Sequence, residues 1–353
     1  MLSTKEREQA GCGVTTSYKC REQHLQLRPG SLVTGIWNKR QYRIVRMLGS
    51  GANGVVYYVT RQQESNVTHK RREQGFAMKI GAETVEFQSE INALTSLEAD
   101  RRKHANRVGR QHARPFLVEA DDVEIDGKKY PCYIMRYVPG VTLSDYLTKH
   151  GLDWFGILGG RLLRRLSELH AGGWVFSDLK AENVLVSADG EVALVDYGGI
   201  TPIGNSIRQF TEWYDRGYWN GGLRSADIGY DLFSFAVLMV HLFQKDQLQN
   251  CVKRSLPQVR QREDLMEIIR QCPRLKPYQA WLERAIYGRF KSTEEAVALW
   301  QQTSRAVYRN IPRPAHPTPR WLKLSFACSF MLLLLLLAYL VMSGSIIDII
   351  WPR

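Results

Sequence analysis

The sequence predicts an α+β fold of two lobes, a β-rich N-lobe and a helical C-lobe, followed by one C-terminal transmembrane helix. Segments with strand and helix patterns alternate from near Tyr42 to about Trp300, without internal repeats. A run with no charged residue follows, from Leu324 to Met342. The chain has 353 residues, of which 44% are hydrophobic. That is enough for the core of one large bilobed domain or of two ordinary ones.

Charge and cysteine content narrow the classes of function. The formal net charge of +13 predicts an anionic partner, such as a membrane surface or nucleic acid. None of the six cysteines forms a C-x-x-C pair, so no zinc or redox motif of that type is expected. Scattered thiols fit a reducing compartment. Met1 to Arg28 lack the apolar core of a secretory signal peptide.

The run from Leu324 to Met342 predicts a single-pass transmembrane helix, because about 20 apolar residues span the hydrocarbon layer of a bilayer. A buried core helix is the alternative, but a soluble helix of this length would normally show a polar stripe, and this run has none. Basic residues gather before the run, so the positive-inside rule predicts a cell-membrane protein with a cytoplasmic N-terminal part. These residues are Arg309, Arg313, Arg320 and Lys323, against Arg353 alone after the run.

The first candidate phosphate-binding element is a G-x-G-x-x-G pattern formed by Gly49, Gly51 and Gly54. A dinucleotide-binding turn needs a helix directly after the glycines, whereas residues 55–60 are β-branched and aromatic and predict a strand. A plain hairpin is the other alternative. A strand–turn–strand flap can close over phosphates, because glycines let the backbone amides approach without a side-chain clash.

The second candidate is Lys79, which lies in the apolar run 77–80. A lysine in a strand that looks buried is costly unless it is paired. Glu86, Glu90 and Leu94 follow at four-residue spacing, which puts them on one face of a helix. We expect Glu90 to pair with Lys79. The alternative is an ordinary lysine that keeps its charge in water.

The third candidate is a set of polar residues at the ends of a predicted hairpin. Asp178, Lys180 and Asn183 precede its first strand, and Asp196 follows its second. Phosphoryl transfer needs a carboxylate that orients the attacking hydroxyl, and oxygen ligands that hold Mg²⁺ between phosphates. Asp178 fits the first role, and Asn183 with Asp196 the second. Lys180 can neutralise charge on the γ-phosphate. The alternative is that these are polar loop residues without a shared role, in which case their order and spacing would be accidental.

Over roughly residues 40–300, the chain therefore resembles the eukaryotic-type (Hanks-type) serine/threonine protein kinases. Their glycine loop, strand lysine, helix glutamate, catalytic loop and metal-binding aspartate occur here in family order. The resemblance implies the bilobed protein-kinase fold, ATP as the phosphate donor, and Mg²⁺ or, in its place, Mn²⁺. Lys180, two residues after Asp178, follows the serine/threonine pattern and not the tyrosine-kinase pattern.

The same resemblance implies an adenine pocket. Met135 would be the gatekeeper, and residues 136–138, which include Tyr137, would be the hinge. Three apolar residues would sandwich the adenine: Val56, Ala77 and Leu185.

Departures from the family pattern are also visible. The usual His-Arg before the catalytic aspartate is Phe176-Ser177, which removes the arginine that usually binds a phosphorylated activation loop. We therefore do not expect this kinase to need such phosphorylation. The usual Phe after the metal aspartate is Tyr197, and residues 217–219 stand where Ala-Pro-Glu is expected. Asp231 matches the aspartate of the long central helix that fixes the catalytic-loop backbone.

A closer resemblance is to the YabT-type kinases of spore-forming bacteria, which share the order of kinase domain, basic linker and C-terminal membrane helix. The matching segments include residues 37–38, 51–54, 173–174 and 214–219. This resemblance implies DNA binding and a link to sporulation.

A basic cluster offers a candidate site for such a polyanion. Lys and Arg residues crowd the stretch Arg101 to Arg114, directly after the Glu90 helix. Solvated surface is the alternative, and anionic lipid is another partner for these charges. DNA would bind here with strong salt dependence and weak sequence specificity, because the chain has no helix-turn-helix or zinc-finger signature.

We therefore expect a serine/threonine protein kinase that phosphorylates proteins at the cytoplasmic membrane face and is stimulated by DNA. A pseudokinase scaffold and a small-molecule kinase are the alternatives; the oligomeric state is left open. The regions expected are an N-terminal extension (1–35), a kinase domain (36–301), a Pro-rich and basic juxtamembrane linker (302–323), the transmembrane helix (324–342) and a short extracytoplasmic tail (343–353).

Overall fold

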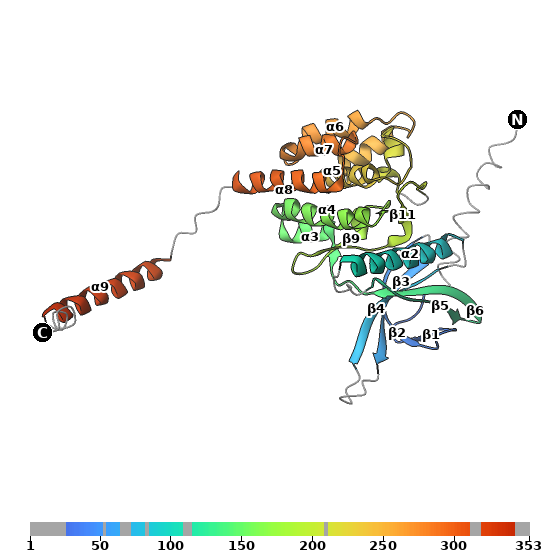
Figure 1. Ribbon diagram of the computed structural model, residues 1–353, viewed down its shortest axis with the longest axis horizontal. Helices are drawn as coiled ribbons and strands as arrows, with labels where there is room; N and C mark the ends of the chain where they lie inside the picture. Colours follow the sequence, from blue (N-terminus) through green and yellow to red (C-terminus); the bar gives the residue numbers. More distant parts are fainter. Residues whose placement is uncertain are drawn as a thin grey trace. The chain divides into compact units, whose positions relative to one another are not determined.

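The computed structural model describes residues 26–51, 54–63, 72–81, 85–108, 115–207, 211–310 and 319–342. It contains two compact units, Met1–Ala306 and Val307–Arg353. The first unit has a strand-rich N-lobe and a helical C-lobe (Figure 1). The predicted fold class is thereby confirmed.

The N-lobe contains a six-stranded antiparallel sheet in the order β1-β2-β3-β4-β6-β5. A bridge between Gly35 and Val123 connects the loop after β1 to β5, so the two ends of the sheet meet. β1 lies inside the range expected to be an N-terminal extension. The strands are β1 (Leu32–Thr34), β2 (Gln41–Gly51), β3 (Gly54–Gln63), β4 (Arg72–Ile80), β5 (Leu117–Ile125) and β6 (Lys128–Arg136).

The curled sheet encloses an apolar core, because alternate residues of a strand point to the same face. Ile44, Val59 and Met78 are among its buried members, and they come from three neighbouring strands. Helix α2 (Val85–Val108) contacts β5 and β6 and lies between the sheet and the C-lobe (Figure 1). Its residues Phe87 and Leu94 are fully buried.

The C-lobe is built around α4 and α5. Its helices are α3 (Leu143–His150), α4 (Phe155–Ala171), α5 (Ile228–Arg254, kinked at Gln244), α6 (Arg262–Gln271), α7 (Gln279–Ile286) and α8 (Thr293–Asn310). Large aromatic rings from several helices fill the core between them. Trp300 packs on Phe235 and Trp281, and its indole N–H donates to the Gly156 carbonyl at 2.8 Å. A Cβ on Gly159 would lie 2.5 Å from Trp300, so this close packing needs glycine.

Short strands between the helices carry the candidate catalytic residues. β9 (Val184–Val186) and β10 (Val192–Leu194) form an antiparallel hairpin, to which β7 (Val141–Thr142) adds a third strand. β8 (Trp174–Val175) pairs with β11 (Thr201–Pro202), and the catalytic loop begins directly after β8.

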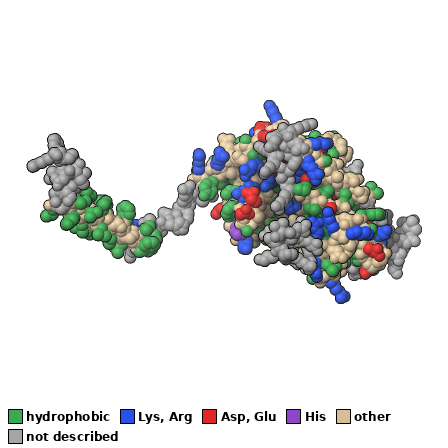
Figure 2. All heavy atoms as spheres, turned by 60° about the horizontal axis from the view of Figure 1, so that its bottom comes forward, with side chains coloured by type: hydrophobic (Ala, Val, Ile, Leu, Met, Phe, Trp, Pro, Cys, Tyr) green, Lys and Arg blue, Asp and Glu red, His purple; other side chains and the backbone are tan. Residues whose placement is uncertain are grey.

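The second unit contains helix α9 (Arg320–Met342). The 20 residues Trp321–Leu340 are long and apolar enough to cross a membrane. Figure 2 shows hydrophobic side chains along the described part of this helix, and Leu333 and Phe330 are among those more than half exposed. α8 continues to Asn310 and α9 begins at Arg320, so helix covers both ends of the range predicted as a linker. The prolines 312, 314 and 317 lie outside the described residues.

Candidate active site

A buried lysine of β4 joins the N-lobe to the candidate active site. Lys79 Nζ lies 2.7 Å and 3.0 Å from the two carboxylate oxygens of Glu90, on α2, and 3.2 Å from Asp196 Oδ1. Burial alone would lower the pKa of Lys79, but the Glu90 and Asp196 carboxylates outweigh it and raise the pKa above its ordinary value. The ammonium group is thus charged and aimed between the helix and the end of the hairpin.

Asp178 lies at the centre of the catalytic loop, with both carboxylate oxygens in hydrogen bonds. Lys180 Nζ is 2.7 Å from Oδ2, and Asn183 Nδ2 is 3.2 Å from the same oxygen. Asn183 Nδ2 also donates to the Asp178 carbonyl at 2.9 Å. The Thr211 hydroxyl donates to Oδ1 at 2.7 Å. Sequence reasoning missed Thr211, because it lies far along the chain and no local pattern marks it.

Asp231, on α5, binds the backbone of this loop. Its side chain is 0% exposed and accepts the backbone N–H groups of Phe176 at 2.7 Å and Ser177 at 2.9 Å. His170 Nε2 lies 3.0 Å from the same carboxylate. Ser177 has φ of 72°, a left-handed conformation that costs a non-glycine residue about 1–3 kcal/mol. The buried carboxylate stabilises that conformation, as the resemblance implied for Asp231.

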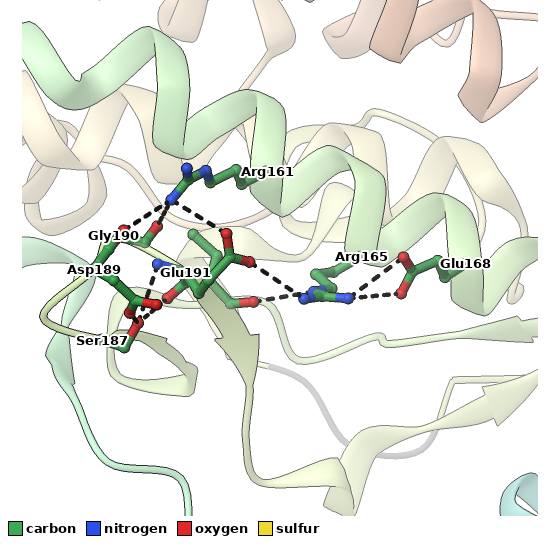
Figure 3. Close-up of polar contacts among 8 residues, drawn as sticks. Arg161, Arg165, Glu168, Ser187, Asp189, Gly190 and Glu191 are labelled. Carbon is green, nitrogen blue, oxygen red and sulfur yellow. Dashed lines mark hydrogen bonds and ion pairs between the residues drawn. The ribbon is translucent and has the colours of Figure 1, made fainter. Parts of the chain in front are cut away.

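The β9–β10 hairpin brings Asn183 and Asp196 together, since one precedes β9 and the other follows β10. Its turn is bound to α4 by two arginines (Figure 3). Arg161 donates to the Gly190 carbonyl and lies 3.5 Å from Glu191 Oε1. Arg165 donates to the Val192 carbonyl at 3.0 Å and lies 3.6 Å from Glu191 Oε2. These contacts fix the hairpin at the end away from the catalytic residues.

Asn183 and Asp196 are the candidate metal ligands. An amide oxygen and a carboxylate are the oxygen donors that Mg²⁺ takes in proteins, usually with water and phosphate oxygens. The described residues contain no group of three or more His, Cys, Asp or Glu side chains suited to a metal. A two-ligand site completed by nucleotide phosphates fits this donor set.

The residues predicted to form the adenine pocket lie on or next to strands of two sheets. Ala77 on β4 and Met135 on β6 are cross-strand partners. Val56, on β3, lies opposite Lys79 of β4, and Leu185 lies in β9. The ring of Tyr137 contacts that of Tyr58, with centroids 4.4 Å apart.

Only part of the glycine turn can be described. Gly49 pairs with Val56, and Gly51 with Gly54, whereas residues 52 and 53 lie outside the described ranges. A Cβ on Gly54 would lie 2.3 Å from the Ile80 carbonyl oxygen, and its φ is 133°, so this position requires glycine.

A line of aromatic rings connects the lobes next to Asp196. Tyr197 packs on Phe116 of the N-lobe with ring centroids 4.7 Å apart, and on Phe176 of the catalytic loop at 5.6 Å. The guanidinium of Arg101, on α2, lies 5.8 Å from the Tyr197 ring centroid. Tyr197 and Phe176 thus fill apolar positions despite the departures from the family pattern.

The segment from Asp196 to Trp219, called the activation segment below, is anchored without Ala-Pro-Glu. Arg260 is 3% exposed, and its Nη1 lies 2.7 Å from Glu212 Oε1. Its Nε and Nη2 donate to the carbonyls of Ser255 at 2.9 Å and Val252 at 3.0 Å. Trp219 is fully buried next to Arg260, with its indole N–H donating to the Trp213 carbonyl at 2.9 Å. The sequence did not reveal this anchor.

Comparison with known proteins identifies the family pattern in this chain. Residues 42–306 match the protein kinase domain model. The serine/threonine-protein kinase YabT of Bacillus subtilis (strain 168) is 32% identical over 83% of this chain and 80% of its own length. The serine/threonine-protein kinase PknE of Mycobacterium bovis is 31% identical over 47% of this chain and 28% of its own length. The structure of vaccinia related kinase 3 matches 84% of this chain and 95% of its own with a TM-score of 0.55 and 17% identity, a likeness of fold.

Proposed function

Since this chain belongs to the protein kinase family and is an ATP-dependent serine/threonine-protein kinase, we propose that Asp178 is its catalytic base and that it works on proteins at the cytoplasmic face of a membrane. One observation carries the first proposal. The Asp178 carboxylate lies among the side chains of Lys180, Asn183 and Thr211, in the loop that ends where the hairpin begins.

In this proposal each residue has a separate task. Asp178 orients the substrate hydroxyl and takes its proton, and Lys180 neutralises charge on the transferred phosphoryl group. Lys79, held by Glu90, contacts the ATP phosphates. Asn183 and Asp196 would hold Mg²⁺, which supplies charge neutralisation between the phosphates.

The test is a labelled-ATP assay on wild type, Asp178→Asn and Lys79→Ala. Asp178→Asn keeps the size of the side chain and lowers phosphate transfer by about 1,000-fold, because the base is lost. Lys79→Ala lowers it to a similar extent. Asp126→Asn, at the exposed tip of the β5–β6 hairpin, is the matched control and keeps wild-type activity. Near wild-type transfer by Asp178→Asn would contradict the assignment.

For the membrane we propose that α9 is the anchor and that the kinase domain, residues 36–301, lies on the cytoplasmic side. The span Trp321–Leu340 of α9 is apolar and is not buried in the structure, which supports its role as the anchor. Removing residues 321–353 should convert a protein that pellets with membranes into one that stays in the supernatant. Protease added outside intact cells should leave the kinase domain whole, and digestion of that domain would overturn the orientation.

We also propose that the basic cluster at 101–114 binds DNA and that binding raises activity. Of this cluster, the structure describes the side chains of Arg101, Arg102 and Lys103; the remaining side chains lie outside the described ones. All three are exposed, and Arg101 also lies 3.4 Å from Glu98 and near the Tyr197 ring. A polyanion bound here would act on the helix that carries Glu90.

The soluble domain without residues 321–353 tests this away from any bilayer. DNA binding and stimulation are measured across a salt series for wild type and for a variant with Arg101, Arg102, Lys103, Arg107 and Arg110 changed to Ala. Binding should fall steeply with salt and be largely lost in the variant, together with stimulation. Equal binding and stimulation in both proteins would remove DNA from the proposal and leave the kinase activity untouched.

A further inference from the structure

Tyr133 contacts the carboxylate that holds the catalytic lysine. It lies on β6 directly opposite Lys79 on β4, so the two side chains leave the sheet on the same face. The Tyr133 hydroxyl donates to Glu90 Oε1 at 2.6 Å, and Lys79 Nζ lies 2.7 Å from that same oxygen. Two neighbouring strands thus bind one carboxylate of α2.

The ring of Tyr133 contacts the same helix one turn earlier. Its centroid lies 5.6 Å from that of Phe87, and both side chains are at most 1% exposed. Phe87 in turn occupies the space next to Gly81, where a Cβ would lie 2.2 Å from the Phe87 ring. The position of α2 is therefore defined by a packed pair of rings as well as by the hydrogen bond.

The hydrogen bond of the Tyr133 hydroxyl stabilises the position of α2 in which Glu90 contacts Lys79. Burial, and then the Glu90 charge, raise the pKa of Tyr133 well above its ordinary value, so the phenol keeps its proton and remains a donor. A shift of α2 away from the sheet would remove the acceptor and leave a buried hydroxyl unpaired. An unpaired buried polar group is unfavourable, so the hydroxyl favours the state in which Glu90 and Lys79 are paired.

We propose that Tyr133 is a positioning residue for phosphoryl transfer. Its hydroxyl holds the Glu90 carboxylate so that Lys79 stays aligned toward Asp196 and the ATP phosphates. This gives the kinase a paired α2 without an activation segment that is phosphorylated, in keeping with Ser177 at the position where an arginine would bind the phosphate. The inference rests on the proposed roles of Lys79 and Asp178.

The experiment compares Tyr133→Phe with wild type in the full-length protein in detergent micelles. The variant keeps the ring against Phe87 and removes only the hydroxyl. We expect kcat to fall about tenfold, which corresponds to about 1.4 kcal/mol, with the KM for a protein substrate unchanged. Tyr130→Phe, the same change at another buried position of β6, is the matched control and keeps wild-type kcat.

A second arm asks whether Tyr133 acts through Glu90. If it does, Tyr133→Phe in a Glu90→Ala background loses no more activity than Glu90→Ala alone, because Ala has no acceptor and the two changes break one interaction. Multiplied losses in the double variant, unchanged kcat in Tyr133→Phe, or equal losses in Tyr133→Phe and Tyr130→Phe would each overturn the inference.

Binding of a fluorescent ATP analogue provides a readout that does not need turnover. Tyr133→Phe should weaken nucleotide binding several-fold, and Tyr130→Phe should leave it unchanged. A wild-type protein that binds nucleotide but transfers no phosphate would contradict the proposed function, whereas the binding comparison would still decide the role of Tyr133.

Discussion

The two sides of the active site are held in different ways. On the nucleotide side, the ammonium group of Lys79 is held by the carboxylates of Glu90 and Asp196. Glu90, which also accepts the Tyr133 hydroxyl, belongs to a helix that packs on the sheet. On the phosphoacceptor side, Asp231 binds the backbone of the catalytic loop, and two arginines bind the hairpin turn. The difference indicates that the catalytic loop is preset, whereas the alignment of Lys79 depends on where α2 lies.

The two sides also differ in the unfavourable energy that their contacts must offset. The catalytic loop contains the left-handed residue Ser177, and the activation segment begins with another, Asp196; the surrounding contacts must stabilise both at all times. The Lys79 side carries its cost as buried charge, which is offset only while the partners are in contact. A change on the first side should therefore damage folding and activity together, and a change on the second mainly activity.

Among changes to the residues that support the two sides, the largest effect is expected from Asp231→Asn, which disrupts the catalytic loop. An amide offers one acceptor where the carboxylate accepts two backbone N–H groups, so a buried donor is left unpaired. We expect the free energy of unfolding to fall by about 3 kcal/mol. Activity should fall by about 100-fold, because small displacements of catalytic groups cost that much.

Thermal unfolding and the labelled-ATP assay measure both losses. Asp246→Asn, on the exposed side of the same helix, is the control and should change neither. An Asp231→Asn protein of wild-type stability would show that the loop backbone does not depend on this carboxylate.

A smaller and more selective effect is expected from Arg260→Ala, which loosens the activation segment. The change removes the ion pair with Glu212 and leaves two helix-end carbonyls without their donor, and it should lower the free energy of unfolding by about 2–3 kcal/mol. Because Glu212 follows Thr211, we expect the KM for protein substrate to rise about tenfold, with the KM for ATP unchanged.

Steady-state kinetics with each substrate varied in turn separates these constants. The comparison variant is Arg270→Ala, whose side chain is largely exposed beside Glu267. A rise in the KM for ATP equal to that for protein substrate would mean that Arg260 supports the whole domain and not the activation segment.

The smallest effect is expected from Arg165→Ala at the hairpin turn. Its guanidinium is partly exposed, and partly exposed ion pairs contribute at most about 1 kcal/mol. The turn also keeps Arg161, so activity should change by less than about twofold. Chemical denaturation of Arg165→Ala and of Arg164→Ala, an exposed arginine on the same helix, measures the difference. A tenfold loss of activity would contradict this prediction and would mean that the hairpin turn determines the geometry of the active site.

Prediction from sequence succeeded where the signal was local. The β-branched run after Gly54, the apolar strand around Lys79 and the polar loop before β9 each marked an element and a candidate residue within a short window. The four-residue spacing on α2 selected Glu90 as the partner of Lys79, and the two groups are in contact. These patterns are short because strand and helix periodicity is short.

The residues that sequence reasoning missed are brought together by tertiary structure. Tyr133 reads as one more aromatic residue in a strand, and only the β4–β6 register puts it beside Lys79. Thr211 contacts Asp178, and Arg260 contacts Glu212 of the activation segment, each across a long stretch of the chain. No periodicity encodes such contacts.

The meeting of β1 and β5 has a consequence for the behaviour of this domain among its neighbours. An open sheet edge exposes a row of backbone donors and acceptors that can recruit a strand from another chain and start aggregation. Here the Ile36 amide donates a hydrogen bond to the Asp122 carbonyl at 2.8 Å. The Asp121 carboxylate accepts the Trp37 and Asn38 amides at 2.9 Å and 3.0 Å. The rim of β5 is thus partly shielded against intermolecular strand addition.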